Sequence, residues 1–328
     1  MNRRAFLASG LLAAGTAWGD PLKPGSPAQV DVHHHLFPPR LRETLAGKIP
    51  DAFLPGVEQS LKEIDASGTA RAVISFPNSD ITTLKAQELS PLIRESNDYA
   101  AGLVMKWPER YRLFASLPMP HIDASLKELA RIGSEIPADG VLLITNYGNR
   151  WLGDPEFSPL LEELDRRGLL VYVHPNAADC CRGLLHGVSD SIVEFQTDTS
   201  RTIASLLFTG TAERMQKIRF LFSHSGGTLP SLVERFERAP KGAPALAAQI
   251  PKGATWYLRR FLYDTAQTAN AGALGALLKI VPDSQVMFGS DFPYRTASEQ
   301  VRQIREMHLG AATTQRILAT NAQRILRL

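Results

Sequence analysis

Cysteine is scarce in this chain of 328 residues, which contains only Cys180 and Cys181. The two are adjacent, and neighbouring cysteines cannot adopt ordinary disulfide geometry without strain in the backbone. The sequence therefore indicates no disulfide framework, whatever compartment the protein occupies. Internal repeats and low-complexity tracts are also absent, and nothing indicates a second domain.

A strong net charge is lacking as well, because 36 basic residues face 33 acidic ones and the formal charge is +3. Arg3 and Arg4 lie in a segment that we expect to be removed, which leaves 34 basic residues against 33 acidic ones. The charge balance therefore gives no indication that the protein binds nucleic acid. No apolar run is long enough to predict a membrane-spanning helix. With 44% hydrophobic and 21% charged residues, the composition is that of an ordinary globular protein.

The first residues are typical of an export signal. Arg3 and Arg4 precede a mildly apolar run of small residues up to Trp18, and residues 17–19 offer a cleavage site. Proline and glycine are frequent over residues 21–27. We therefore predict a twin-arginine signal peptide and linker over residues 1–27, and a periplasmic or secreted location for the remainder. The alternative is an exposed N-terminal helix.

From residue 28 to the end, strand-like and helix-like segments alternate. Several strand segments are almost continuously apolar, as a parallel sheet buried on both faces requires. Eight strands, each followed by a helical segment, favour a closed (β/α)8 TIM barrel over a doubly wound sheet. We predict one barrel domain over residues 28–328, with strands at 29–34, 72–76, 113–117, 140–145, 169–174, 219–224, 261–264 and 285–290. The predicted helices are at 57–67, 125–132, 155–167, 199–216, 271–280 and 299–327, the last broken at Gly310.

Histidines end the first of these strands, just before two prolines stop it. His33 and His35 share one face of the strand because successive side chains alternate, whereas His34 faces the other way. Two imidazoles on one face can reach a single metal ion. For this stretch alone, a chance pair in a buried strand or the remnant of a tag are the alternatives.

Three later strands also end in possible metal ligands. His174 ends the fifth strand, His224 ends the sixth, and Asp291 follows the eighth. In a parallel barrel all of these ends meet on one rim. A single histidine there is more often structural, but four imidazoles and a carboxylate would be costly to bury without partners. A divalent metal ion would satisfy them together.

The order and spacing of several motifs resemble the amidohydrolase-2 branch of the metal-dependent amidohydrolases, which contains aminocarboxymuconate-semialdehyde decarboxylase. Within this branch, the chain is most similar to decarboxylases of the 6-methylsalicylate type. The resemblance covers residues 29–328 and is carried by residues 31–35, 117–120, 147–155, 172–175, 224–230, 263–266 and 288–293.

The resemblance implies that His33, His35 and His174 bind one metal ion, with Asp291 as a further ligand. It implies that His224 is a catalytic histidine that activates water or moves protons, with Asp291 as a second candidate for proton delivery. Imidazole and carboxylate donors suit Zn2+, with Mn2+ as the alternative, and catalysis needs an open coordination position.

Around these residues we expect supporting and substrate-binding side chains. Asp31 and Asp264 are candidates for orienting the histidines, and His34 for packing in the core. In the aminocarboxymuconate-semialdehyde decarboxylases, which this chain resembles, an arginine at the position that matches Arg235 reaches a neighbouring subunit's site and binds a substrate carboxylate. Arg235 is therefore a candidate substrate ligand and an indication of a homodimer, with an ordinary solvated charge as the alternative. The predicted pocket residues follow strand ends: Phe37, Phe76, Asn146, Tyr147, Trp151 and Phe292.

The resemblance favours a metal-dependent, non-oxidative decarboxylase that releases CO2 from a small carboxylic acid. The segment 39–57 is short and lacks the arginine-bearing loop of the semialdehyde decarboxylases, which favours a compact, salicylate-like aromatic acid over an open-chain substrate. Two alternatives remain open. The same ligands could serve a hydrolase that opens a lactone or another acyl substrate, or a periplasmic metal-binding protein without catalysis.

Overall fold

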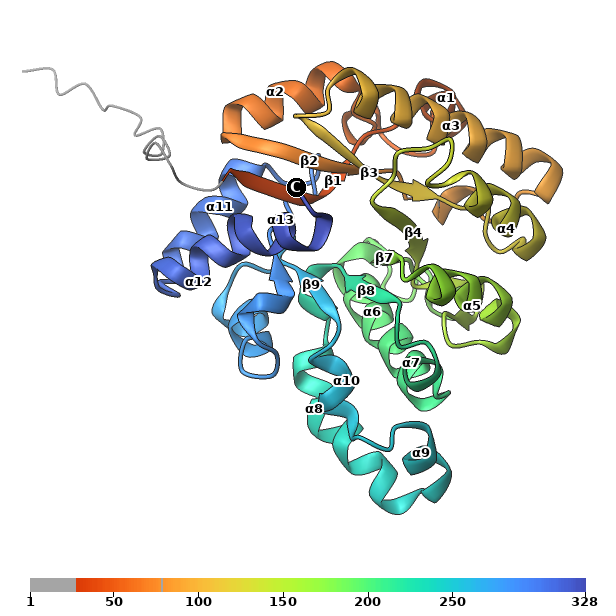
Figure 1. Cartoon of the computed structure of the whole chain (residues 1–328), viewed down its shortest axis with the longest axis vertical. Coiled ribbons are helices and arrows are strands. Elements are labelled where there is room, and N and C mark those ends of the chain that lie inside the picture. Colours follow the sequence, from red (N-terminus) through yellow and green to blue (C-terminus); the bar gives the residue numbers. More distant parts are fainter. Residues whose placement is uncertain (1–27, 78) are drawn as a thin grey trace, which may run out of the picture.

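Eight parallel strands form one sheet in the computed structural model of this chain, which describes residues 28–77 and 79–328 (Figure 1). The strands pair in the order in which they follow one another along the chain, and β5 (Asn146–Tyr147) and β6 (Arg150–Trp151) form a separate antiparallel pair. The bounds of the eight are β1 Gln29–His35, β2 Thr69–Ser75, β3 Tyr111–Ser116, β4 Gly140–Ile144, β7 Leu170–His174, β8 Arg219–Phe222, β9 Leu262–Asp264 and β10 Val286–Met287.

The sheet closes into a barrel because β1 also bonds to the chain after β10. The backbone N–H of Val32 donates to the carbonyl of Phe288, and that of His35 donates to the carbonyl of Phe292, both at 2.9 Å. The first strand thereby gains a partner on each side, and no sheet edge is left at this seam. The predicted (β/α)8 barrel is confirmed.

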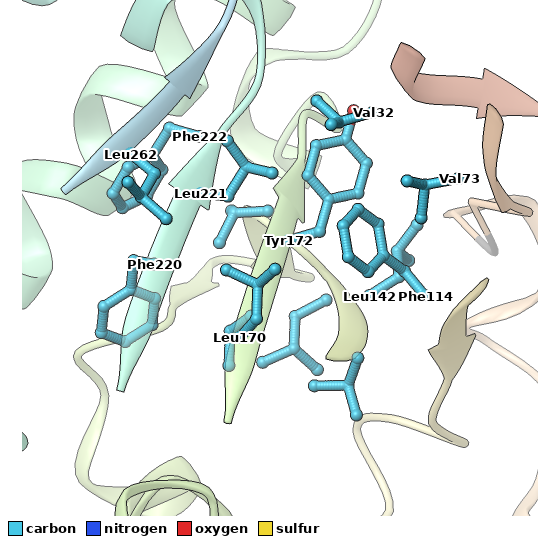
Figure 2. Close-up of a cluster of buried hydrophobic side chains, with 14 of the residues drawn as sticks. Val32, Val73, Phe114, Leu142, Leu170, Tyr172, Phe220, Leu221, Phe222 and Leu262 are labelled. Carbon is cyan, nitrogen blue, oxygen red and sulfur yellow. The ribbon is translucent and has the colours of Figure 1, made fainter. Parts of the chain in front are cut away.

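Side chains of the sheet strands meet in one apolar cluster, part of which is drawn in Figure 2. The consecutive residues Phe220, Leu221 and Phe222 of β8 are all buried, which shows that both faces of this strand are covered, as expected for a parallel sheet. The labelled members of the cluster are Val32, Val73, Phe114, Leu142, Leu170, Tyr172, Phe220, Leu221, Phe222 and Leu262.

Helices connect the strands and cover the outside of the sheet (Figure 1). Gly68 and Gly168 end α2 and α5 in the left-handed conformation, as their positions in the sequence predicted. The α-helices are α1 Pro39–Leu45, α2 Val57–Ser67, α3 Ala86–Lys106, α4 Ile122–Arg131, α5 Ser158–Arg167, α6 Asp190–Phe208, α7 Thr211–Arg214, α8 Leu229–Arg238, α9 Pro244–Gln249, α10 Ala254–Leu258, α11 Ala297–Glu306, α12 Ala311–Gln315 and α13 Asn321–Leu326.

Several helical segments differ from the prediction, and the short helices α1, α9 and α10 are not among the predicted ones. The 21-residue helix α3 is not among the predicted helices, because Pro91 lies inside its first turns and hides the helical pattern. Helix α6 starts nine residues before the predicted position 199, capped by Ser189, and Gly210 separates it from α7. The predicted helix 271–280 is reduced to a π-helical turn over Ala271–Gly275.

The C-terminal helix packs against the ends at which the strands begin. Gln323 of α13 donates its side-chain amide to the carbonyl of Ala28, next to the start of β1, at 2.9 Å. Arg219, the first residue of β8, donates to the carbonyl of Ile325 at 3.0 Å. Both ends of the described chain therefore lie on the same face of the barrel, opposite the strand ends that carry the histidines.

The predicted signal peptide and linker over residues 1–27 lie outside the described residues and stay a prediction, as does the location that they imply. In the part of the chain that the structure describes, no helix is long and apolar enough to cross a membrane.

Replacing Gly140 with Ala should destabilise the barrel. A Cβ atom at Gly140 of β4 would lie 2.3 Å from the carbonyl oxygen of Leu170 in the paired strand β7. Overpacking of this kind costs about 1–3 kcal/mol. As a control, Gly102 lies within α3 and its Cβ would meet no atom within 4 Å, so Gly102→Ala should be neutral or stabilise by roughly 0.5–1 kcal/mol. Thermal unfolding of both variants tests this, and an undisturbed Gly140→Ala would contradict the strand packing.

Candidate metal centre

Four side chains from three strand ends converge on one buried point. His33 and His35 come from β1, His174 is the last residue of β7, and Asp291 follows β10. One possible ligand atom of each lies within 4.8 Å of the others, and all four residues are buried. The structure thus brings together the four residues that the sequence predicted as metal ligands.

The spacing of these atoms suits a divalent ion. The Nε2 atoms of His33 and His35 lie 3.2 Å apart, and Asp291 Oδ1 lies 3.0 Å from the first and 3.1 Å from the second. Ligand atoms that share one ion stand roughly 3 Å apart, since each is about 2 Å from it. Three nitrogens and a carboxylate oxygen are ligands that Zn2+ or Mn2+ accepts, so the residues fit the group.

Hydrogen bonds behind the ligands fix which ring nitrogen faces the centre. His33 donates from Nδ1 to Asp264 Oδ2 at 2.9 Å. His174 donates from Nδ1 to the carbonyl of Pro175 at 2.9 Å. In both rings the proton is held on Nδ1, which leaves Nε2 free to bind an ion.

Asp264 also positions His224, the predicted catalytic histidine. Its Oδ1 accepts from the backbone N–H of His224 at 2.9 Å, and the carbonyl of Ala266 accepts from His224 Nδ1 at 2.8 Å. His224 Nε2 then lies 3.9 Å from Asp291 Oδ2. Strand β8 ends at Phe222, two residues before the predicted end, and His224 and Ser225 both have positive φ. Such backbone conformations are uncommon outside glycine and cluster at functional sites.

The carboxylates control the protonation of the cluster. Burial lowers the pKa of His33, but Asp291 and Asp264 outweigh this effect and raise it to about 10. Burial raises the pKa of Asp291, yet His33 brings it well below its usual value. Burial lowers the pKa of His35 and of His174. At neutral pH and without an ion, the cluster therefore holds one extra proton, on His33.

Asp31, a candidate for orienting the histidines, lies behind them and bonds to the backbone of one of them. Its Oδ1 accepts from the backbone N–H of His33 at 3.1 Å and from that of Ser290 at 2.9 Å, and its Oδ2 accepts from the Ser290 hydroxyl at 2.6 Å. His34 faces away from the centre, contacts Asp31 Oδ2 and Ser60 Oγ, and stacks on Phe292 with ring centroids 4.7 Å apart. The expected packing role of His34 is consistent with these contacts.

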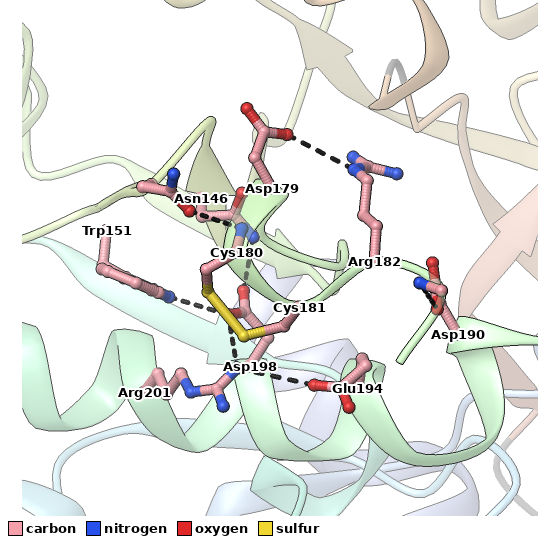
Figure 3. Close-up of a disulfide and its surroundings, with 12 residues drawn as sticks. Asn146, Trp151, Asp179, Cys180, Cys181, Arg182, Asp190, Glu194, Asp198 and Arg201 are labelled. Carbon is pink, nitrogen blue, oxygen red and sulfur yellow. Dashed lines mark hydrogen bonds and ion pairs between the residues drawn. A yellow bond between two sulfur atoms is a disulfide. The ribbon is translucent and has the colours of Figure 1, made fainter. Parts of the chain in front are cut away.

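The predicted pocket residues are placed unevenly around the centre. The ring of Phe37 lies 6.4 Å from that of His35, whereas Phe292 is engaged with His34. Asn146 and Trp151 donate to the buried carboxylate of Asp198 at 2.6 and 2.8 Å (Figure 3). Phe76 and Tyr147 are buried in the core. The amide nitrogen of Asn146 and the indole N–H of Trp151 are thus occupied by the protein itself, whereas Asn146 Oδ1 is buried without a hydrogen-bond partner.

Cys180 and Cys181 form a disulfide between neighbouring residues in the loop after β7 (Figure 3). A short turn over Asp179–Cys181 brings the two side chains together. Because the bond joins neighbouring residues, it links no separate segments and gives the fold no framework.

Arg235 is exposed in α8. In this single described chain it contacts no residue of the metal cluster. Its predicted role at a neighbouring subunit's site, and the homodimer, stay predictions.

Sequence reasoning missed two polar residues at the centre and its rim. Gln267, three residues after Asp264, donates its side-chain amide to Asp291 Oδ2. Asp198 is fully buried on α6 and was overlooked because the predicted helix began at residue 199. Its position within an amphipathic helix was the available signal.

Comparison with known sequences identifies the family. A sequence profile of the amidohydrolase family matches residues 30–328. The chain belongs to this family. A decarboxylase (yanB) of Aspergillus niger is 34% identical over 298 residues, which cover 85% of this chain and 81% of that protein. The 6-methylsalicylic acid decarboxylase acuB of Aspergillus aculeatus is 32% identical over 304 residues, which cover 87% of this chain and 90% of that protein.

The fold of this amidohydrolase also matches solved structures. A 5-carboxyvanillate decarboxylase from Novosphingobium aromaticivorans, complexed with manganese and a nitrobenzoic acid, superimposes with a TM-score of 0.83 at 18% identity. The match covers 92% of this chain and 96% of that one. At this identity the likeness shows the barrel fold.

Binding of Zn2+ or Mn2+ to the metal-stripped protein should release close to one proton below pH 10, because the ion replaces the proton on His33. Since His33 is then the only ligand that competes for a proton, the apparent affinity should rise about ten-fold for each pH unit near neutrality. Calorimetry in buffers of different ionisation enthalpy counts the protons. A metal affinity that does not change with pH would contradict a protonated His33.

Proposed function

We propose that this protein is a metal-dependent, non-oxidative decarboxylase of a small aromatic acid that carries a hydroxyl group beside the carboxylate. The observation that carries the proposal is the buried cluster of three histidines and Asp291 with His224 Nε2 directed at it. The two relatives described above, at 34% and 32% identity, are decarboxylases by name, and the name of the second gives 6-methylsalicylic acid as its substrate. The sequences of both relatives align with most of the barrel domain of this chain.

His33, His35, His174 and Asp291 would hold the metal ion. The nitrogen-rich donor set favours Zn2+. Mn2+ is the alternative, because the 5-carboxyvanillate decarboxylase structure was solved with manganese. The bound ion would supply a fixed positive charge that favours an anionic acid at this site.

Proton delivery falls to His224 and Asp291. The Nδ1 proton of His224 is held by the carbonyl of Ala266, so Nε2 is the nitrogen that can take up and give a proton at the site. When the bond between the ring carbon and the carboxylate breaks, CO2 leaves, the electron pair stays on the carbon, and that carbon takes one proton. The two candidates for delivering this proton, His224 Nε2 and Asp291 Oδ2, lie 3.9 Å apart, which supports the proposal.

The surroundings of the centre suit an aromatic ring. The rings of Phe37 and Tyr294 lie 6.4 and 6.1 Å from that of His35, and the ring of Phe195 lies 6.4 Å from that of His174. Tyr294 stacks on Phe53 and is 43% exposed. Among these aromatic residues, Tyr294 therefore lies on the side that faces solvent. Aromatic walls with a few polar groups are usual for small conjugated ligands.

A substrate panel separates the proposed activity from its alternatives. Salicylates with different ring substituents, a benzoate without the hydroxyl group and several lactones are incubated with metal-loaded protein. We expect CO2 release from the hydroxylated acids alone, since only they offer two adjacent oxygens. Acid production from lactones without CO2 would instead indicate a hydrolase. Tight metal binding without turnover of any compound would indicate a metal-binding protein and contradict the proposal.

His224→Asn should lower kcat by roughly 10²–10⁴-fold, the usual contribution of a general acid or base, and leave metal content unchanged. The metal is retained because His224 is not one of the four converging ligands. The matched control is His308→Asn, which alters an exposed histidine between α11 and α12 and should keep wild-type kcat. If His224→Asn turns over like the wild type, the role given to His224 is wrong.

A further inference from the structure

Gln267 contacts the metal centre from outside the ligand set. Its side-chain amide donates to Asp291 Oδ2, whereas Oδ1 of the same carboxylate lies 3.0 Å from His33 Nε2 and 3.1 Å from His35 Nε2. The two oxygens of Asp291 therefore have different surroundings. One faces the ring nitrogens of the ligands, and the other faces the amide.

The backbone of Gln267 is held in an unfavourable conformation. Its φ is +55°, in the left-handed region that a glutamine rarely adopts. The backbone N–H donates to the side-chain oxygen of Gln300 at 3.0 Å, and Gln300 is buried on α11. Because the side chain of Gln267 is itself exposed, burial does not explain this conformation. Strain of this kind persists where the surrounding structure fixes it, often at a functional site.

The turn that contains Gln267 also accepts hydrogen bonds from two other side chains of the centre. Asp264 accepts from His33 Nδ1, and Ala266 accepts from His224 Nδ1. The hydrogen bond from Gln267 to Asp291 adds a third contact within four residues of chain. The turn therefore contacts one ligand on β1, the histidine after β8 and the ligand after β10.

We propose that Gln267 is a positioning residue for Asp291, and this inference rests on the proposed metal centre. The amide holds Oδ2, so that the carboxylate cannot rotate freely and Oδ1 is the oxygen presented to the ion. A carboxylate without this contact has a broad choice of rotation about its last bond, and it would have to be ordered when the ion binds. The amide suits this task because it donates a hydrogen bond without adding a charge to the buried cluster.

The test compares Gln267→Ala and Gln267→Met with the wild type in the full chain. Affinity for Mn2+ is measured on metal-stripped protein by competition with a chelator. Loss of the donor should weaken binding about 10–100-fold in Gln267→Ala, the usual effect of removing a hydrogen bond behind a ligand. Gln267→Met has a side chain of similar length that carries neither a donor nor a charge, so it should bind Mn2+ as weakly as Gln267→Ala. If Gln267 only filled space, the methionine variant would bind Mn2+ like the wild type, which would overturn the proposal.

Gln267→Gly separates the side chain from the backbone. Glycine accepts a positive φ without strain, so this variant should unfold at the wild-type temperature or above it and still bind Mn2+ about 10–100-fold more weakly. It serves as the decisive variant if the other two do not fold. Gln315→Ala, at an exposed glutamine of α12, is the matched control and should keep wild-type affinity.

His33→Ala distinguishes a failure of this inference from a failure of the metal centre. Loss of Mn2+ in His33→Ala, together with wild-type affinity in the three Gln267 variants, would overturn the role of Gln267 alone. Wild-type affinity in His33→Ala would overturn the centre itself, and the proposed role with it. Loss of Mn2+ in His33→Ala with weakened binding in Gln267→Gly supports both.

Discussion

The carboxylate of Asp264 is the contact on which the site depends. One of its oxygens accepts from the imidazole of His33 and the hydroxyl of Tyr172, and the other accepts from the backbone of His224 and of Ala266. The pKa of Asp264 is lowered despite its burial, chiefly by the charge of His33, so the carboxylate stays ionised. A single side chain thus orients His33, a candidate metal ligand, and the backbone of His224, the residue proposed to move protons.

The closure of the barrel is a condition for the metal centre. His33 and His35 lie on the first strand and Asp291 follows the last, so the cluster spans the seam at which the sheet closes. The backbone N–H of Asp291 donates to the carbonyl of His33 at 2.9 Å across this seam. Asp31 joins the same two segments by accepting from Ser290. Residues more than 250 positions apart can share one ion only after the complete sheet has formed, so ion binding and folding are coupled.

The sequence predicted the barrel and the convergence of the four candidate ligands for a definite physical reason. Side chains alternate along a strand, and all parallel strands of a barrel end on one rim, so a histidine pair such as His33 and His35 could be matched with later strand ends. The remaining features have no periodic signal. An exposed glutamine in a turn, Gln267, is recognised only once the fold brings it to Asp291. Arg235 cannot be assigned from one chain, because its predicted partner belongs to another subunit.

The contacts of α13 have a practical consequence for handling the protein. Ala28 and Ile325 both lie where the strands begin, whereas the histidines lie where they end. The seven residues of β1 separate these two faces by about 20 Å, at roughly 3.3 Å per residue. An affinity tag, a fused carrier or a linker to a solid support would therefore attach on the far side of the barrel if it were joined at Ala28 or at the C-terminus. Immobilised in this way, the protein would keep the strand ends that carry the histidines open to dissolved compounds.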